Sequence, residues 1–138
     1  MKTAMLAAAG MAAIFQAATA AQAAPVVCAI AGDYQGQYDG PNDRGFLRVS
    51  VASGDGALTG KAQSAVTGEV FAVGGVLNAD GTLAAGSATA SGAQLTGRFV
   101  PNVGSGNWSK LVPYSDGTQR TLTGSWGVER IADDDDCQ

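Results

Sequence analysis

The side chains that could do chemistry in this chain are few, and histidine is absent. Without histidine, a Ser-His-Asp triad, a Cys-His pair and a His-ligated zinc site are all excluded. The only glutamates are Glu69 and Glu129, and most aspartates fall in turn-like segments where they support the backbone. A flexible run of four aspartates at 133–136 lacks the fixed cage that binds calcium. We therefore expect a protein that is not an enzyme, with no metal and no cofactor.

The residue types that remain favour binding. Trp108 and Trp126 fall on two neighbouring predicted strands, so both could face one cavity and stack on a ligand. Tyr34 is a further aromatic candidate for the same site. The alternative is that these rings simply fill the core, because an interior of Ala, Gly, Val and Leu needs a few large side chains. Both interpretations stay open at this stage.

A repeated triplet indicates what positions these rings. Leu-Thr-Gly occurs at 58–60, 95–97 and 122–124, and the first and last copies closely follow the Asp-Gly turns at 55–56 and 116–117. Asp-Gly is typical of tight hairpins because glycine adopts positive φ. In an extended strand the Leu and Gly share one face and the Thr takes the other. The chain is thus predicted to be a series of short antiparallel strands.

Alternation of apolar and polar residues predicts eight strands in the chain. They cover residues 34–39, 45–53, 57–65, 69–77, 82–90, 93–100, 107–113 and 118–131, and the glycine-rich segment 101–106 is the longest loop. The predicted fold class is all-β, an up-and-down β-barrel, with a β-sandwich as the alternative. Glycines inside the strands are expected where strands coil sharply or lie beneath a large aromatic ring.

The two ends of the chain indicate export. Residues 1–23 have a positive start, an apolar stretch and a small-residue cleavage site, as in a secretory signal peptide. The barrel domain is expected over 24–131, and 132–138 form an acidic tail. The predicted location is secreted or periplasmic. A lipoprotein with a lipidated Cys28 is the alternative, although the preceding Pro-Val-Val fits poorly.

Cys28 and Cys137 are the only cysteines, and an exported protein with an even count is expected to form a disulfide. The bridge would close a loop of about 110 residues, worth roughly 4–5 kcal/mol by loop-closure entropy. It requires the first and last strands to lie side by side, as they do in a closed barrel. Two free thiols on frayed ends are the alternative.

Charge excludes some partners. The chain has 8 basic and 12 acidic residues, a formal net charge of −4, and no basic face or polybasic patch. Nucleic acid is therefore not an expected partner. Membrane insertion is not expected either, because the second strand face carries Thr, Lys, Gln, Arg and Ser in place of an apolar outer band.

One segment resembles the avidin and streptavidin family. It consists of residues 55–60, Asp-Gly-Ala-Leu-Thr-Gly, followed by Ser-Ala-Val at 64–66. The resemblance implies a secreted eight-stranded barrel that binds biotin, with Ser64 contacting the biotin head group and Asn42 at the place of a head-group asparagine. The chain departs from the family at Ala62 and Phe46, where the family has a tyrosine and a serine. It also has fewer tryptophans than that family places around the ligand.

The sequence thus predicts an exported, non-catalytic β-barrel that binds a small molecule or a protein partner. An avidin-like biotin binder is one alternative, and a structural or inhibitory cell-envelope interaction protein is another. A cavity lined by Trp108 and Trp126 would favour a small molecule. A filled interior with an exposed loop at 102–106 would favour a protein partner.

Overall fold

The computed structural model describes residues 25–88 and 91–137. The predicted signal peptide, residues 1–23, lies outside the described residues. The described chain contains no α-helix, and therefore no helix of the length and apolarity needed to cross a membrane. Its secondary structure consists of strands joined by short turns.

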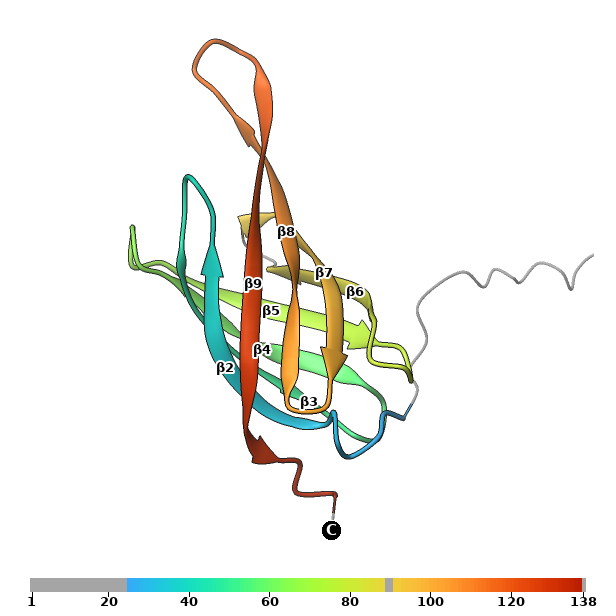
Figure 1. The fold of residues 1–138 in the computed structure, drawn as a ribbon. Helices are drawn as coiled ribbons and strands as arrows, with labels where there is room; N and C mark the ends of the chain where they lie inside the picture. The colour runs from blue at the N-terminus through green and yellow to red at the C-terminus, as the bar shows by residue number, and fades with distance from the viewer. Residues whose placement is uncertain (1–24, 89–90, 138) are drawn as a thin grey trace, which may run out of the picture.

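Eight antiparallel strands close into one barrel, which confirms the predicted fold (Figure 1). Each strand pairs with its neighbour in sequence, and the first pairs with the last. The strands are β2 (Gly32–Asp39), β3 (Gly45–Val51), β4 (Ala57–Ser64), β5 (Val70–Leu77), β6 (Leu83–Ala88), β7 (Ala93–Val100), β8 (Val103–Pro113) and β9 (Gln119–Asp133).

Strand alternation sorts side chains between interior and solvent as expected from the sequence. On β3, Leu47, Val49 and Val51 are buried while the residues between them are exposed. In the repeated triplets, Leu58 is buried beside an exposed Thr59, and the other two copies follow the same phase. The barrel core therefore comes from alternate residues of every strand.

The two tryptophans explain several of the glycines within the strands. Trp108 on β8 lies opposite Gly124 on β9, and Trp126 on β9 lies opposite Gly106 on β8. A Cβ atom at Gly124 would overlap the Trp108 indole, and one at Gly97 would lie 2.7 Å from the Trp126 ring. Glycine is thus required where an indole lies flat on the neighbouring strand.

The predicted loop at 101–106 is wrong. Val100 pairs with Val103, so only Pro101 and Asn102 form the turn and β8 begins at Val103. Proline followed by a residue at positive φ, here Asn102 at 72°, is the pattern of a type II turn. The glycines at 104 and 106 misled the prediction because they belong to a strand packed under Phe99 and against the backbone of β7.

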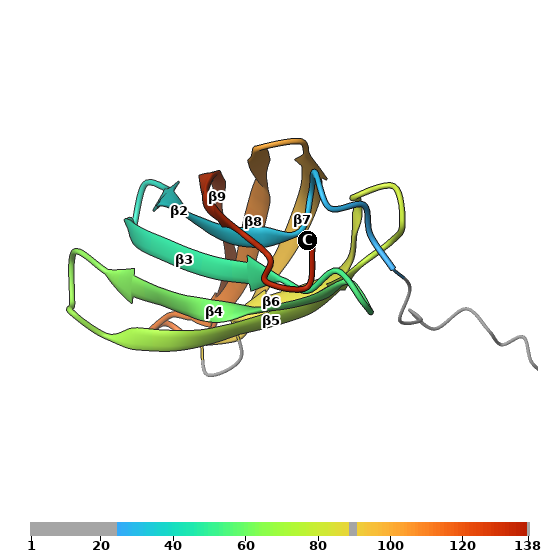
Figure 2. The ribbon, with the colours of Figure 1, turned by 90° about the horizontal axis from the view of Figure 1, so that it is seen from below.

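One end of the barrel is filled and covered. Tyr34, Phe99 and Trp126 pack there, with ring centroids 4.9 Å apart for the first pair and 5.6 Å for the second. The lead-in segment 25–31 crosses this end and buries Val26, Ile30 and Ala31 (Figure 2). The Tyr34 hydroxyl donates to the Ile30 carbonyl, so its polar atom is satisfied within the core.

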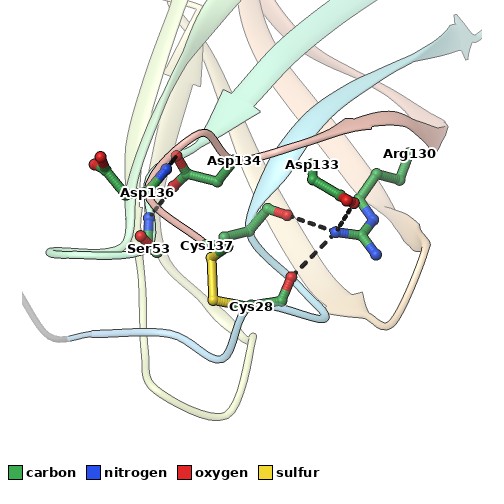
Figure 3. Close-up of a disulfide and its surroundings, with 8 residues drawn as sticks. Cys28, Ser53, Arg130, Asp133, Asp134, Asp136 and Cys137 are labelled. Carbon is green, nitrogen blue, oxygen red and sulfur yellow. Dashed lines mark hydrogen bonds and ion pairs between the residues drawn. A yellow bond between two sulfur atoms is a disulfide. The ribbon is translucent and has the colours of Figure 1, made fainter.

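A disulfide joins the lead-in to the last residues of the chain at this covered end (Figure 3). Cys28 and Cys137, 109 positions apart in sequence, have Cα atoms 5.6 Å apart. The Arg130 guanidinium lies beside the bridge, donates to the carbonyls of Cys28 and Ala31 at 3.1 and 3.0 Å, and pairs with Asp133 at 3.0 Å. The predicted bridge is confirmed, and hydrogen bonds support it.

The C-terminal acidic segment is held more firmly than the expected tail. Strand β9 continues to Asp133, and the Asp134 carboxylate accepts hydrogen bonds from the backbone N–H groups of Ser53 and Asp136. These hydrogen bonds lower the pKa of Asp134 below its usual value. The segment thus ties the β3–β4 turn to the disulfide-bonded end.

Removal of the disulfide should lower stability substantially. In the Cys28→Ser, Cys137→Ser double variant we expect the free energy of unfolding to fall by roughly 3–5 kcal/mol, because the unfolded chain regains the entropy of a long loop. Urea unfolding followed by circular dichroism measures this loss. Reduced wild-type protein should match the variant, and an unchanged midpoint in both would contradict the structural role of the bridge.

Strand closure should depend on Gly36. A Cβ there would overlap the Gly127 carbonyl on β9, so Gly36→Ala should destabilise by about 1–3 kcal/mol or more and weaken β2–β9 pairing. Gly54→Ala, at a turn position with open space around it, is the matched control and should be near neutral. Thermal unfolding compares the two, and equal effects would refute the packing argument.

Candidate functional site

The opposite end of the barrel is open and contains the candidate site. The turns at 40–44 and 65–69 surround it together with Ser91, and strands β8 and β9 extend past it. Below these turns a cavity of about 50 Å³ remains inside the barrel wall. The cavity is lined by aromatic residues (Tyr38, Phe71, Trp108), polar residues (Asp43, Ser91, Lys110) and aliphatic residues (Leu47, Ala62, Val73, Ala88, Ala93, Leu95).

The cavity exists because small side chains face large ones at this level of the barrel. Ala62, Ala88 and Ala93 are almost fully buried, yet each contributes only a methyl group to the interior. The large rings Phe99 and Trp126 lie at the covered end and do not reach this space. The half of the barrel at the open end is therefore less filled than the half at the disulfide-bonded end.

Asp43 is the centre of a polar cluster at the cavity. Its Oδ1 accepts a hydrogen bond from the Ser64 hydroxyl at 2.7 Å, and its Oδ2 accepts one from the Tyr38 hydroxyl at 3.1 Å. The three residues come from the turn after β2, the end of β4 and β2 itself. The pairing of the consecutive strands β2, β3 and β4 thus brings together a carboxylate, a phenol and a hydroxyl.

Ser64 is buried, with 2% of its surface exposed, and its hydroxyl is fully engaged. Besides donating to Asp43, it accepts from the backbone N–H groups of Val66 and Thr67 at 3.1 and 3.0 Å. It closes the β4–β5 turn, and its hydrogen bond holds the Asp43 carboxylate in position. Ser64 therefore supports the cavity wall without lining the cavity.

Tyr38 is held in its neutral form by this surrounding. Burial, the hydrogen bond to Asp43 and the negative charge of Asp43 together raise its pKa to about 12. The phenol can donate a hydrogen bond over the whole physiological pH range. It is consequently a structural donor and a ring surface, and a poor general base at neutral pH.

Trp108 forms one wall of the cavity. Its indole N–H donates to the Asp39 carbonyl at 3.0 Å, which fixes the ring orientation. The Trp108 and Tyr38 rings stand nearly perpendicular, at 88°, with centroids 6.3 Å apart. Because the indole N–H is already used, Trp108 offers the cavity an aromatic surface.

The structure separates the residues that the sequence grouped as candidates. Trp108 lines the cavity, and Ser64 lies directly behind it. Trp126 and Tyr34 lie in the filled half, where the Trp126 indole N–H donates to the Thr96 carbonyl. Asn42 is exposed in the β2–β3 turn and does not line the cavity.

Sequence reasoning missed Asp43 and Lys110. The count from the resembling segment pointed to Asn42, one residue before the side chain that faces the cavity. Lys110 falls two residues after Trp108, so the alternation of β8 could have placed it on the same side. No sequence signal indicated that the β2–β3 turn folds its aspartate inward onto Ser64.

Other hollows on the molecule are open and lie on its outer surface. One lies over Thr96, Asn107 and Ser125 on the outer faces of β7, β8 and β9. Within residues 25–88 and 91–137, no three acidic, cysteine or histidine side chains are arranged to hold a metal ion. The cavity below the turns is thus the site with the most distinctive chemistry.

Comparison with known proteins adds no family to this geometry. No family model matches the chain, and no curated protein matches its sequence. The eight-stranded closed barrel is compatible with an avidin-like architecture. The function must therefore be argued from the site itself.

The raised pKa of Tyr38 predicts a pH dependence of stability. The neutral phenol is favoured in the folded state, so its contribution is complete below pH 10 and is lost as the pH rises toward 12. Tyr38→Phe should show a smaller loss of unfolding free energy between pH 9 and about 11 than the wild type does. Urea unfolding at several pH values measures the difference, and identical alkaline losses would refute the assignment.

Proposed function

We propose that this protein is an exported, non-catalytic barrel that binds a small ligand at its open end. The observation that carries the proposal is the contrast between the two ends. The end with the disulfide is filled with aromatic side chains, whereas the other end keeps a cavity walled by Trp108, Tyr38 and Asp43. Concave apolar sites with a few fixed polar groups are typical of ligand binding.

The chemistry of the cavity supports binding over catalysis. The buried hydroxyl beside the cavity, on Ser64, already donates to Asp43 and accepts two backbone N–H groups, so it has no geometry for nucleophilic attack. The chain has no histidine to act as a base near neutral pH. Export is supported by the disulfide and by the signal-like residues 1–23.

Size limits the ligand. A cavity of about 50 Å³ holds only a few water molecules, whereas sites for drug-sized ligands enclose roughly 300–1,000 Å³. A small ligand, or the head group of a larger one, fits this volume. Biotin, which the local resemblance suggests, would fit only with its ring system at the mouth or with movement of the surrounding turns.

A protein partner is the second candidate, and the β8–β9 arm favours it. Beyond Ser109, the last partner of β7 on β8, the two strands pair only with each other and project past the barrel (Figure 1). Leu111 on this arm has 58% of its surface exposed. An exposed apolar side chain on a projecting ribbon is a suitable contact for another protein.

Filling the cavity tests the proposal. Ala93→Val adds two methyl groups to the cavity wall. It should weaken ligand binding by roughly tenfold or more, because the added methyl groups take up the space that the ligand would occupy. Native mass spectrometry of protein purified from its host detects a retained ligand, and addition of biotin tests that candidate directly. Ala72→Val, at an exposed position of β5, is the matched control and should retain the ligand.

The outcomes separate the two candidates. Loss of the ligand in Ala93→Val, but not in Ala72→Val, supports the cavity as the binding site. A ligand that both variants retain equally would place binding elsewhere. A protein partner that survives filling of the cavity would favour the arm.

A further inference from the structure

The cavity presents two perpendicular aromatic rings together with a carboxylate. Tyr38 and Trp108 form a corner with an interplanar angle of 88°, and Phe71 lines the cavity as a third ring. The faces of such rings attract cations, and aromatic cages are a common means of binding alkylated ammonium groups. This corner is therefore suited to a cation that sheds its water.

Asp43 adds a full negative charge to the same wall. Its two oxygens each accept one hydrogen bond, from Ser64 and from Tyr38, and each keeps a lone pair for a further partner. Those two hydrogen bonds hold the carboxylate in one orientation beside the aromatic corner. The cavity thus combines a fixed anion with ring faces, and both favour a positive group.

Lys110 brings the opposite charge to the mouth. It follows Trp108 by two residues on the same side of β8, one step beyond the last rung that β8 shares with β7. In the described part of the chain the one ion pair joins Arg130 and Asp133, so the ammonium of Lys110 does not pair with Asp43. Two opposite charges therefore line one small cavity without neutralising each other directly.

We propose that the ligand is a small zwitterion with an alkylammonium group at one end and a carboxylate at the other. The ammonium group would lie in the corner formed by Tyr38, Trp108 and Asp43, and the carboxylate would pair with Lys110 at the mouth. Glycine betaine has this charge order, and only its ammonium end would enter the cavity. The inference rests on the proposed function, since it names the ligand class of the same cavity.

The two charges also discriminate against other ligands. A simple cation would meet the positive charge of Lys110, and a simple anion would meet the negative charge of Asp43, because both residues line the cavity. A neutral molecule would displace water from both charges without replacing their interactions. The arrangement thus selects for a molecule that carries both signs in the right order.

Calorimetric titration of the purified, oxidised protein with three probes tests the inference. Glycine betaine should bind, while choline, which lacks the carboxylate, and acetate, which lacks the cation, should bind about tenfold more weakly or worse. Lys110→Met should lower the affinity for glycine betaine by about tenfold without lowering the affinity for choline. Asp43→Asn should weaken both, and Lys61→Met, on the outer face of β4, is the matched control and should change neither.

The outcomes distinguish the ligand class from the function. Equal binding of choline and glycine betaine to the wild type, or no effect of Lys110→Met, would overturn the zwitterion. Binding of biotin or a neutral molecule in place of glycine betaine would also overturn it, and would leave the proposed function standing. If no probe binds and native mass spectrometry finds no retained ligand, both proposals fail. Because Asp43→Asn removes a charge from a turn, its thermal unfolding is measured alongside, and Lys110→Met provides the test if that turn is disturbed.

Discussion

The pairing of the first strand with the last is the constraint on which the rest of this structure depends. β2 and β9 are distant in sequence, and their register, with Gly36 opposite Val128, closes the sheet into a barrel. Closure leaves no exposed sheet edge along these two strands and gives every strand one interior face. It also brings the lead-in and the C-terminal segment to the same end. There the disulfide and the Arg130 hydrogen bonds hold them together.

The interior volume then determines where a site can form. Eight strands enclose a space just wide enough for side chains to fill. In this barrel the filling is uneven along the axis, because Tyr34, Phe99 and Trp126 all lie near the covered end. Alanines face inward at the other end, so Trp108 and Tyr38 surround a gap that they do not fill. The position of these five aromatic side chains and of three alanines thus explains why one end is solid and the other hollow.

The sequence was sufficient to predict the barrel because its signals are local and repeated. Alternation, Asp-Gly turns and the Leu-Thr-Gly triplets each report on a few adjacent residues, and the paired cysteines report that the two ends meet. The prediction at 101–106 failed because glycine occurs both in loops and at crowded positions within strands. Gly104 and Gly106 looked like a loop, but they are strand positions that make room for Phe99 and for the backbone of β7.

The site was less predictable because it depends on contacts between distant segments. Trp108 and Trp126 are equivalent in sequence terms, yet they lie two rungs apart on adjacent strands and therefore at different depths of the barrel. Asp43 faces inward because Ser64, twenty-one positions away, donates a hydrogen bond to it. No alternation pattern applies to a turn residue such as Asp43, so the direction of its side chain follows from tertiary packing alone.

The separation of the two ends also has an energetic logic. Charged groups inside a barrel are destabilising unless they are paired or hydrogen-bonded, and Asp43 receives only two hydrogen bonds from side chains. The open end therefore carries a charged group with few hydrogen bonds, together with a cavity that forgoes packing contacts. The disulfide, the aromatic cluster and the tied acidic segment all lie at the other end, where they stabilise the fold without approaching the cavity. Stability concentrated at the covered end allows the open end to keep an unfilled, polar-walled cavity, which is the arrangement that the proposed ligand site requires.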